Sequence, residues 1–456
     1  MLKIAGVLAV PGVGGYYVED LAALQSSPIP IKDRYTAPPL TPGFRAVREV
    51  AEALSVGLVL EDSTDPGAPP QVAWGDCLTV AYGGKAGRDP VFRAAPHVAV
   101  VDQEIAPLLI GQPVEAFRPL AAQVDSQIAA LDLPAAPDGA SAPPLSRREV
   151  LSPARLLRAF REELDKSLTP QPPAVERPAP PPSKHTALRY GIGQALLRAA
   201  ALARGVTMAE VVAEEWGLPL PSQPVPIHAQ SGGERIHNAD KMIARRVGSL
   251  PHGLVDDIPA QVGESGDRLA QYVRYLKDRI TTLAPSGYHP TIHLDVHGAL
   301  GILAEGQPGR LLGMLYQLES AASPYPLRVE CPVMMESRAA QIELMALLRE
   351  YLRIRGMGVK LVADEWANTL EDIQAFVEAG AADMIQIKTP DLGGVHNAVE
   401  AVLACQAGGV SAFLGGSCAE TDLSTQVSVH LALATHPDLI LAKPGMGVDE
   451  GFMLVH

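Results

Sequence analysis

The chain has 456 residues, of which 47% are hydrophobic and 19% are charged. This globular composition excludes a wholly disordered or collagen-like protein, while the length predicts two or three domains or one large barrel with an appendage. The formal net charge is −14, from 37 Lys and Arg against 51 Asp and Glu, which disfavours a nucleic-acid-binding function. No run of about 18 apolar residues occurs, so we expect no membrane-spanning segment and a cytoplasmic protein.

The cysteines are spread along the chain and form no Cys-x-x-Cys pair. This spacing indicates neither a zinc knuckle nor a disulfide framework, and it is typical of a protein in a reducing cytosol. We therefore expect small buried side chains at Cys77, Cys331 and Cys405, with Cys418 as the exception.

Strand patterns precede helical patterns in the first part of the chain. Residues 4–10, 53–61 and 71–81 read as strands, and residues 96–110 and 187–203 read as helices. This order predicts an α+β domain that extends to about residue 222.

A proline-rich segment interrupts this domain, because residues 134–184 hold 12 of the 41 prolines. Such a composition is typical of a linker or a surface insertion. Within it, Ser152 and Pro153 predict a helix cap and first turn, followed by an amphipathic stripe. We expect one docked helix with apolar contacts at Leu156, Leu157, Phe160, Leu164 and Leu168.

From about residue 225 the pattern changes to short apolar strands that alternate with amphipathic helices. Eight such units in about 220 residues predict a (β/α)8 barrel over residues 223–456. Helix signals between the strands include a cap at Thr369 with Asp372, and a stop at Gly356. The predicted strands are VPIHAQ (225–230), HGLVDD (252–257), TIHLDV (291–296), LRVECP (327–332), KLVADE (360–365), MIQIKT (384–389), AFLGGS (412–417) and LILAKP (439–444).

Alternate residues of these strands are polar where a structural barrel would be apolar. Side chains of a strand point alternately to its two faces, so one set faces the helices and the other faces the barrel interior. Active sites of this fold lie at the carboxyl ends of the strands, and unpaired charges inside a barrel would be costly. The predicted inward set is His228, Gln230, His293, Asp295, Arg328, Glu330, Asp364, Gln386 and Lys388.

Three carboxylates end three successive strands, at Asp295, Glu330 and Asp364. Converging oxygen ligands of this kind favour a hard divalent cation, magnesium or manganese. The alternative is that each acid only caps the helix that follows it.

Lys388 follows the next strand, in QIKTPDLGG. A nearby cation and desolvation would lower the pKa of its ammonium group and make a neutral lysine available as a base. The alternative is a salt bridge to one of the inward acids.

These segments carry a family resemblance. VPIHAQSG, LPHGLVDD, HLDVHG, RVECP, VADEW, QIKTPDLGG and KPGMGVDEG resemble the signature of the methylaspartate ammonia-lyase family, in the enolase superfamily. GFRAVREVAEALSVGLVLED, WGDC and AGRDPVF are similar to the capping domain of that family. The resemblance covers nearly all of the chain except the proline-rich segment. It implies an α+β capping domain at residues 1–222 over a modified (β/α)8 barrel.

The resemblance also implies roles for individual residues. Asp295, Glu330 and Asp364 would bind Mg²⁺, and Lys388 would remove the C3 proton of L-threo-3-methylaspartate. His252, on the opposite face, would serve the other diastereomer. Contacts to the substrate carboxylates would come from Gln230, Gln386, Ser417 and the backbone amide of Cys418.

Three positions depart from the family pattern. Where the family motif AVQYSG has a glutamine, this chain has Ala81, which should enlarge the pocket. Ser417 stands where a threonine is usual and keeps a hydroxyl group, while Cys331 replaces a glycine and should narrow the site. We therefore expect the same reaction class with a preference for a bulkier substituent at C3 or nitrogen.

The resulting prediction is a carbon–nitrogen lyase that uses Mg²⁺ or Mn²⁺ and no organic cofactor. Its substrate would be a small amino-dicarboxylate and its product mesaconate, as in amino-acid degradation, with no nucleic-acid or membrane partner. Family analogy implies a homodimer. The alternatives are a racemase, epimerase or dehydratase of the same superfamily, and a noncatalytic scaffold. The absence of a second lysine on the strand of His252 disfavours a racemase.

Overall fold

The computed structural model describes residues 1–20, 23, 37–65, 67–82, 86–131, 147–164, 184–220, 223–232, 234–255, 257–417, 419–442 and 448–455. Eight parallel strands close into a barrel in the order β10-β11-β4-β5-β6-β7-β8-β9, which confirms the predicted architecture. The strands are β4 (Ile227–Ala229), β5 (Ser249–His252), β6 (Thr291–Asp295), β7 (Leu327–Glu330), β8 (Lys360–Ala363), β9 (Met384–Ile387), β10 (Ser411–Leu414) and β11 (Leu439–Ala442).

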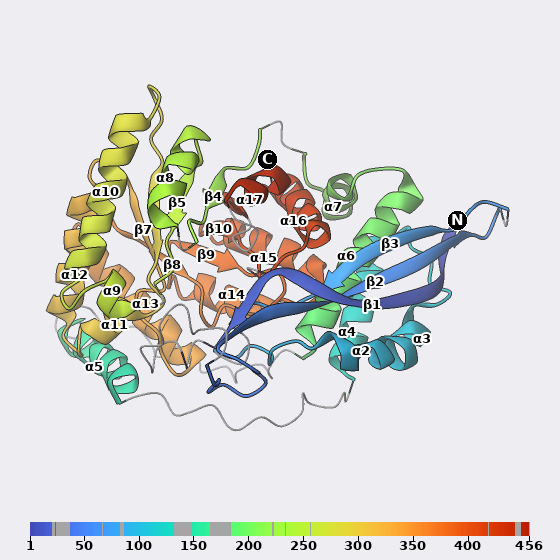
Figure 1. Cartoon of the computed structure of the whole chain (residues 1–456), viewed down its shortest axis with the longest axis horizontal. Coiled ribbons are helices and arrows are strands. Elements are labelled where there is room, and N and C mark those ends of the chain that lie inside the picture. The colour runs from blue at the N-terminus through green and yellow to red at the C-terminus, as the bar shows by residue number, and fades with distance from the viewer. Residues whose placement is uncertain are drawn as a thin grey trace.

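Helices surround this barrel (Figure 1). Thr369 and Asp372 form the predicted capping box, and Gly356 follows its helix with φ +64°, as a terminating glycine should. The helices are α8 (Arg235–Ala244), α9 (Ile258–Gln261), α10 (Asp267–Leu283), α11 (Ala299–Leu303), α12 (Pro308–Ala322), α13 (Arg338–Ile354), α14 (Leu370–Glu378), α15 (Val395–Ala407), α16 (Asp422–Thr435) and α17 (Val448–Val455).

The second barrel strand was placed wrongly from the sequence. β5 ends at His252, where the predicted strand began. His252 and Gly253 have φ values of +61° and +60°, which turn the chain out of the extended conformation and prevent the strand from continuing. His252 therefore lies at the carboxyl end of its strand, level with the other strand ends.

The two faces of the barrel strands are as different as the alternation predicts. Helix-facing residues such as Ile292, Leu294 and Ile385 belong to the main hydrophobic core under the helices. The barrel interior holds its own apolar cluster, so polar residues of the interior lie between this cluster and the open end. The interior cluster is Val362, Met384, Phe413, Leu439 and Leu441.

A three-stranded antiparallel sheet, in the order β1-β2-β3, lies beside the barrel (Figure 1). Its strands are β1 (Leu2–Glu19), β2 (Arg48–Asp62) and β3 (Gln71–Cys77), so the first two are longer and the third is shorter than predicted. Gly75 and Gly191 allow close approach of β3 and α6, because a Cβ at Gly75 would lie 2.1 Å from the Gly191 carbonyl oxygen. The helices of this part are α2 (Ala94–Val100), the π-helical turn η2 (Val101–Ile105), α3 (Ala106–Leu109), α4 (Phe117–Ala129), α6 (Thr186–Arg204) and α7 (Met208–Trp216).

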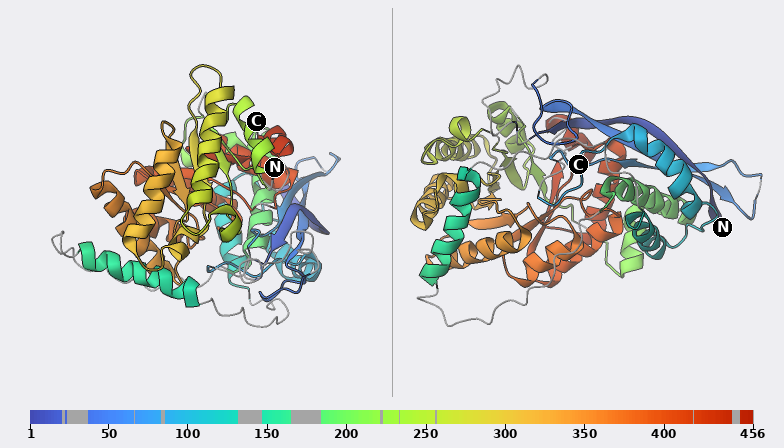
Figure 2. Two further views of the ribbon diagram at one scale, coloured as in Figure 1. Left: turned by 60° about the vertical axis from the view of Figure 1, so that its left-hand side comes forward. Right: turned by 90° about the horizontal axis from the view of Figure 1, so that it is seen from below.

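The helix predicted within the proline-rich segment exists as α5 (Arg147–Leu164) and packs on the outside of the barrel (Figure 2). It begins five residues before Ser152, so the predicted cap at this serine is wrong. The buried Ser152 hydroxyl instead donates to the Gly301 carbonyl oxygen at 2.6 Å and accepts from the Gly306 backbone nitrogen at 3.1 Å. Ser152 therefore ties α5 to the end of α11. The predicted contacts of Leu164 and Leu168 lie outside the side chains that the structure describes.

Ser152→Ala should weaken this attachment. The substitution leaves buried polar groups of the α11 end without their partner, and we expect a loss of about 1–3 kcal/mol in the free energy of unfolding. Urea unfolding measures the loss, and hydrogen exchange at residues 301–306 should locate it. Ser63→Ala is the control, because the Ser63 hydroxyl donates to a backbone carbonyl in an exposed turn. Equal effects of the two substitutions would contradict the assigned role.

None of the helices that the structure describes combines the length and apolar character that crossing a bilayer requires.

Candidate active site

The residues predicted to carry the chemistry gather at one end of the barrel. His252, Asp295 and Glu330 end β5, β6 and β7. Asp364 and Lys388 directly follow β8 and β9. All are buried, with exposed fractions of 7% or less. Parallel strands of a closed barrel end at the same rim, so residues far apart in the sequence meet there.

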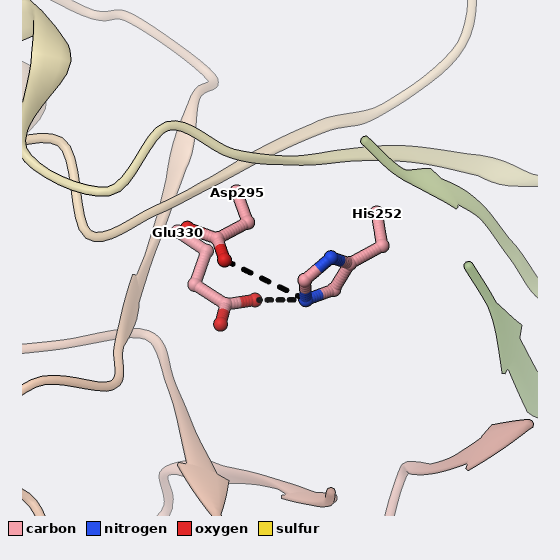
Figure 3. Close-up of side chains that lie close together, drawn as sticks. All are labelled: His252, Asp295 and Glu330. Atoms are coloured by element: carbon pink, nitrogen blue, oxygen red, sulfur yellow. Dashed lines mark ion pairs between the residues drawn. The ribbon is translucent and has the colours of Figure 1, made fainter. Parts of the chain in front are cut away.

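His252, Asp295 and Glu330 form a group that is able to hold a metal ion (Figure 3). The His252 Nε2 atom lies 3.7 Å from Asp295 Oδ2 and 3.8 Å from Glu330 Oε2. Asp295 and Glu330 are directly paired in the register of β6 and β7, which explains why their carboxylates converge. One oxygen of Glu330, Oε1, is buried without a hydrogen-bond partner.

Asp364 lies outside this group and pairs with Lys388. The Lys388 Nζ atom lies 2.7 Å from Asp364 Oδ1 and 2.8 Å from Oδ2. The salt bridge that was the alternative reading of Lys388 is thus present, and it joins the third predicted metal ligand to the predicted base.

The electrostatics of this cluster favour a bound cation. Burial, followed by Asp364, raises the pKa of Asp295 well above its usual range. Burial, followed by Asp295 and Asp364, does the same to the pKa of Glu330. Without a cation, the ionised forms of both carboxylates are therefore unfavourable, and a bound divalent cation would stabilise them. The oxygen donors and the unpartnered Glu330 Oε1 fit a hard cation such as Mg²⁺.

The pKa of Lys388 is raised, whereas the sequence predicted a lowered value. Burial and Arg88 do act to lower it, as predicted. The carboxylates of Asp364, Glu365 and Asp391 outweigh them and stabilise the ammonium form.

Lys388 and His252 come from opposite sides of the barrel. In the closed order of strands, β5 and β9 are separated by three strands on either side. Between them, on β6 to β8, stand the three carboxylates. Burial, followed by Lys388, lowers the pKa of His252 to about 3, so its imidazole is neutral. A molecule bound among these groups would have the lysine on one face and the neutral histidine on the other.

The residues predicted to bind carboxylates lie on or shortly after the barrel strands β4, β9 and β10. The Nε2 atom of Gln230 lies 3.2 Å from the Nδ1 atom of His252. Gln386 is buried and its Oε1 atom has no hydrogen-bond partner. Ser417 is fully buried after β10, where its hydroxyl accepts from the Ala419 backbone nitrogen at 2.8 Å. Cys418 lies outside the described residues.

The capping domain brings Ala81 to the rim. The Ala81 backbone nitrogen donates to the Ser417 carbonyl oxygen at 2.9 Å, and its side chain packs with Tyr82 and Leu254. The ring of Tyr82 lies 5.6 Å from that of His297, two residues after Asp295. Cys331, which was expected to narrow the site, directs its sulfur to the Val333 carbonyl oxygen at 3.5 Å.

Sequence reasoning missed Arg88. This residue of the capping domain is buried among three barrel carboxylates: it pairs with Glu365, and lies 2.7 Å from Asp391 and 3.7 Å from Asp364. Burial alone would raise the pKa of Glu365, but Arg88, followed by Lys388 and His297, holds this pKa well below its usual range. The motif AGRDPVF contained this arginine, yet no local pattern shows which carboxylates it meets.

Comparisons with known proteins show the family of the chain. Models of the methylaspartate ammonia-lyase N-terminus and C-terminus match residues 2–136 with 158–217, and 219–456, respectively. The chain is 42% identical over 455 residues to methylaspartate ammonia-lyase 2 of Carboxydothermus hydrogenoformans, covering 100% of this chain and 96% of that protein. The chain belongs to the methylaspartate ammonia-lyase family. It is accordingly an enzyme, as the sequence predicted. Of the segment expected to be an insertion, the family model leaves only residues 137–157 unmatched.

Solved structures of this family have the same fold. The methylaspartate ammonia-lyase of Citrobacter amalonaticus containing (2S,3S)-3-methylaspartic acid has a TM-score of 0.82 at 39% identity, over 99% of this chain and 97% of that one. The magnesium complex of β-methylaspartase from Clostridium tetanomorphum has a TM-score of 0.78 at 38% identity, over 99% and 96%. Muconate cycloisomerase of Pseudomonas fluorescens, at 16% identity and a TM-score of 0.54, shares the fold.

Proposed function

We propose that the protein is a magnesium-dependent carbon–nitrogen lyase that eliminates ammonia from L-threo-3-methylaspartate or a related 3-substituted aspartate. The product from 3-methylaspartate is mesaconate. The observation that carries the proposal is the placement of Lys388 across the barrel from His252, with buried carboxylates between them. Family membership supports the reaction class.

The cation would be held by Asp295, Glu330 and Asp364, with His252 beside them. When bound, it supplies positive charge next to the substrate carboxylate, where negative charge develops as the C3 proton leaves. With Asp364 engaged as a metal ligand, less negative charge would remain beside Lys388, so the pKa of Lys388 would fall and its neutral amine would accept this proton at Nζ. The electron pair of the C3–H bond becomes the C2=C3 double bond, and the C2–N bond breaks to release ammonia. His252, on the opposite face of the substrate, would serve the other diastereomer in the same way.

The amides and the serine orient the substrate. Gln230, Gln386 and Ser417 border the site with hydrogen-bonding groups, and the Gln386 Oε1 atom is unpartnered. Contacts of these groups with the two substrate carboxylates hold C3 near Lys388 in a reactive orientation. By family resemblance, we also propose that the enzyme is a homodimer.

Incubation with 3-methylaspartate and MgCl₂ tests the proposed reaction. We expect ammonia release together with the absorbance of a conjugated diacid, both abolished by a chelator. Release of ammonia without the conjugated diacid, or activity that survives chelation and dialysis, would contradict it.

Ala81→Gln should narrow the substrate range. Position 81 packs at the rim beside Ser417 and Leu254, so a glutamine there adds bulk and a hydrogen-bonding group to the pocket. We expect the ratio of kcat/KM for 3-ethylaspartate to that for 3-methylaspartate to fall by about tenfold, as for one methylene in a filled pocket. An unchanged ratio would mean that residue 81 does not line the pocket for the C3 substituent. Ala73→Gln is not a suitable control because it would disrupt the sheet core, so Ala68→Gln in an exposed turn serves instead.

A further inference from the structure

The rings of three histidines, from β4, β5 and β6, lie close together inside the barrel, with His252 in the site and His228 and His293 below it. The ring centroid of His228 lies 4.3 Å from that of His293 and 5.4 Å from that of His252. His228 also meets the ring of Phe413 edge-on at 5.0 Å. His228 on β4 comes two residues before Gln230, which directly follows this strand, so both side chains face the barrel interior and His228 lies one layer below the rim. His228 thus forms part of the floor beneath His252.

Two of these histidines have polar partners in the site and one has none. The His293 Nε2 atom lies 2.7 Å from Glu330 Oε2, and the His252 Nδ1 atom lies 3.2 Å from Gln230 Nε2. His228 is fully buried, and neither of its ring nitrogens has a hydrogen-bond partner of acceptable geometry. The backbone of Ser249, which pairs with His228 in the register of β4 and β5, acts on the ring in the direction that raises the pKa of His228.

An unpartnered imidazole in this place is costly unless a ligand uses it. Burying a polar group without a hydrogen bond is unfavourable, and an apolar side chain would fill the floor at no such cost. Burial, followed by the neighbouring His252, lowers the pKa of His228 well below its usual range, so the ring is neutral. A neutral imidazole offers one N–H donor and one acceptor nitrogen, which match a hydroxyl group.

We propose that His228 determines substrate specificity by hydrogen-bonding a polar substituent at C3 of the substrate. The preferred substrate class is then a 3-substituted aspartate whose substituent carries a hydroxyl or a similar hydrogen-bonding group, rather than a purely alkyl group. This inference rests on the proposed lyase function, because it takes the ligand beside His252 to be a 3-substituted aspartate.

3-Hydroxyaspartate and 3-methylaspartate form a matched pair for the test, because hydroxyl and methyl groups are similar in size. Elimination from the hydroxy compound follows the same course: the C3–H pair forms the double bond, ammonia leaves C2, and the enol product tautomerises to a 2-oxo diacid. The wild-type enzyme should favour the hydroxy compound in kcat/KM. His228→Phe should lower the hydroxy-to-methyl ratio by at least about tenfold, since a site built for a hydroxyl discriminates strongly.

Two further variants separate hydrogen bonding from packing. His228→Gln keeps a donor and an acceptor and should retain most of the wild-type ratio. His430→Phe removes a histidine with an unpartnered Nδ1 atom on α16, outside the barrel interior, and should leave the ratio unchanged. A wild-type preference for the methyl compound, or a ratio that His228→Phe leaves within twofold, overturns the inference. The second result would mean that His228 makes no hydrogen bond to the C3 substituent.

Calorimetric binding of both compounds in the presence of MgCl₂ distinguishes this inference from the proposed function. If neither compound is deaminated, but the hydroxy compound binds more tightly and His228→Phe abolishes the difference, the lyase function fails and the role of His228 stands. If deamination occurs with an unchanged ratio, the role of His228 fails alone. Absence of both binding and turnover overturns both.

Discussion

Lys388→Arg is expected to lower kcat by about 10²- to 10⁴-fold, as the loss of a general base does. The arginine keeps a positive charge next to Asp364, so the carboxylate that Lys388 contacts at 2.7 Å retains a partner. A guanidinium group does not lose its proton in this pH range and cannot accept one from C3. The variant therefore removes the base while preserving the charge.

Exchange of the C3 hydrogen with deuterium from solvent, followed by NMR, measures proton removal directly. We expect the exchange to disappear in Lys388→Arg and in Lys388→Ala for the L-threo compound. Lys360→Ala is the matched control, because Lys360 begins β8 at the other end of the barrel and is 61% exposed. Exchange at the wild-type rate in either Lys388 variant would rule out Lys388 as the base.

Asp295→Asn is expected to stabilise the protein in the absence of a cation and to remove its stabilisation by Mg²⁺. A carboxyl whose folded-state pKa is raised contributes stability only at low pH, and this contribution is lost as the pH rises through the folded-state pKa. At pH 7 an exposed aspartate is ionised, so burying Asp295 in this cluster costs stability that an uncharged amide would not cost, and we expect Asp295→Asn to gain about 1–3 kcal/mol.

The wild-type protein should be stabilised by Mg²⁺, whereas Asp295→Asn should not. A cation at a concentration 100 times its Kd stabilises the folded state by about 2.7 kcal/mol, and we expect the variant to lose most of this gain. Thermal unfolding with and without MgCl₂ measures both effects. Asp278→Asn, at an exposed position on α10, serves as the control. Stabilisation of Asp295→Asn by Mg²⁺ equal to that of the wild type would exclude this carboxylate as a ligand.

Strand alternation was sufficient to predict which barrel residues point inward. His228, Asp295, Glu330 and Gln386 are buried in the interior because side-chain direction follows from the period of two along a strand. Closure into eight units followed from the same repeated pattern. Strand boundaries were less certain: the end of β5 at His252 depends on two positive φ values, which residue type alone did not reveal.

Which charged side chains of the site pair with one another was not predictable in the same way. The sequence offered Asp364 as a metal ligand and Lys388 as a base with a lowered pKa. In the folded protein, Asp364 and two further carboxylates surround Lys388 and raise that pKa. A pKa is set by distances of a few ångströms to charges on other strands, and such distances are not encoded in spacing along the chain.

The sequence by itself determined the barrel, its inward polar residues and the family to which the chain belongs, because each of these depends on local periodicity or on motifs within single strand ends. Only the tertiary structure decided that Arg88 reaches from the capping domain to Asp364, Glu365 and Asp391, and that His228 is left without a partner under His252. Both are contacts, or missing contacts, between segments far apart in the chain, and they exist only once the two domains and the barrel strands have packed.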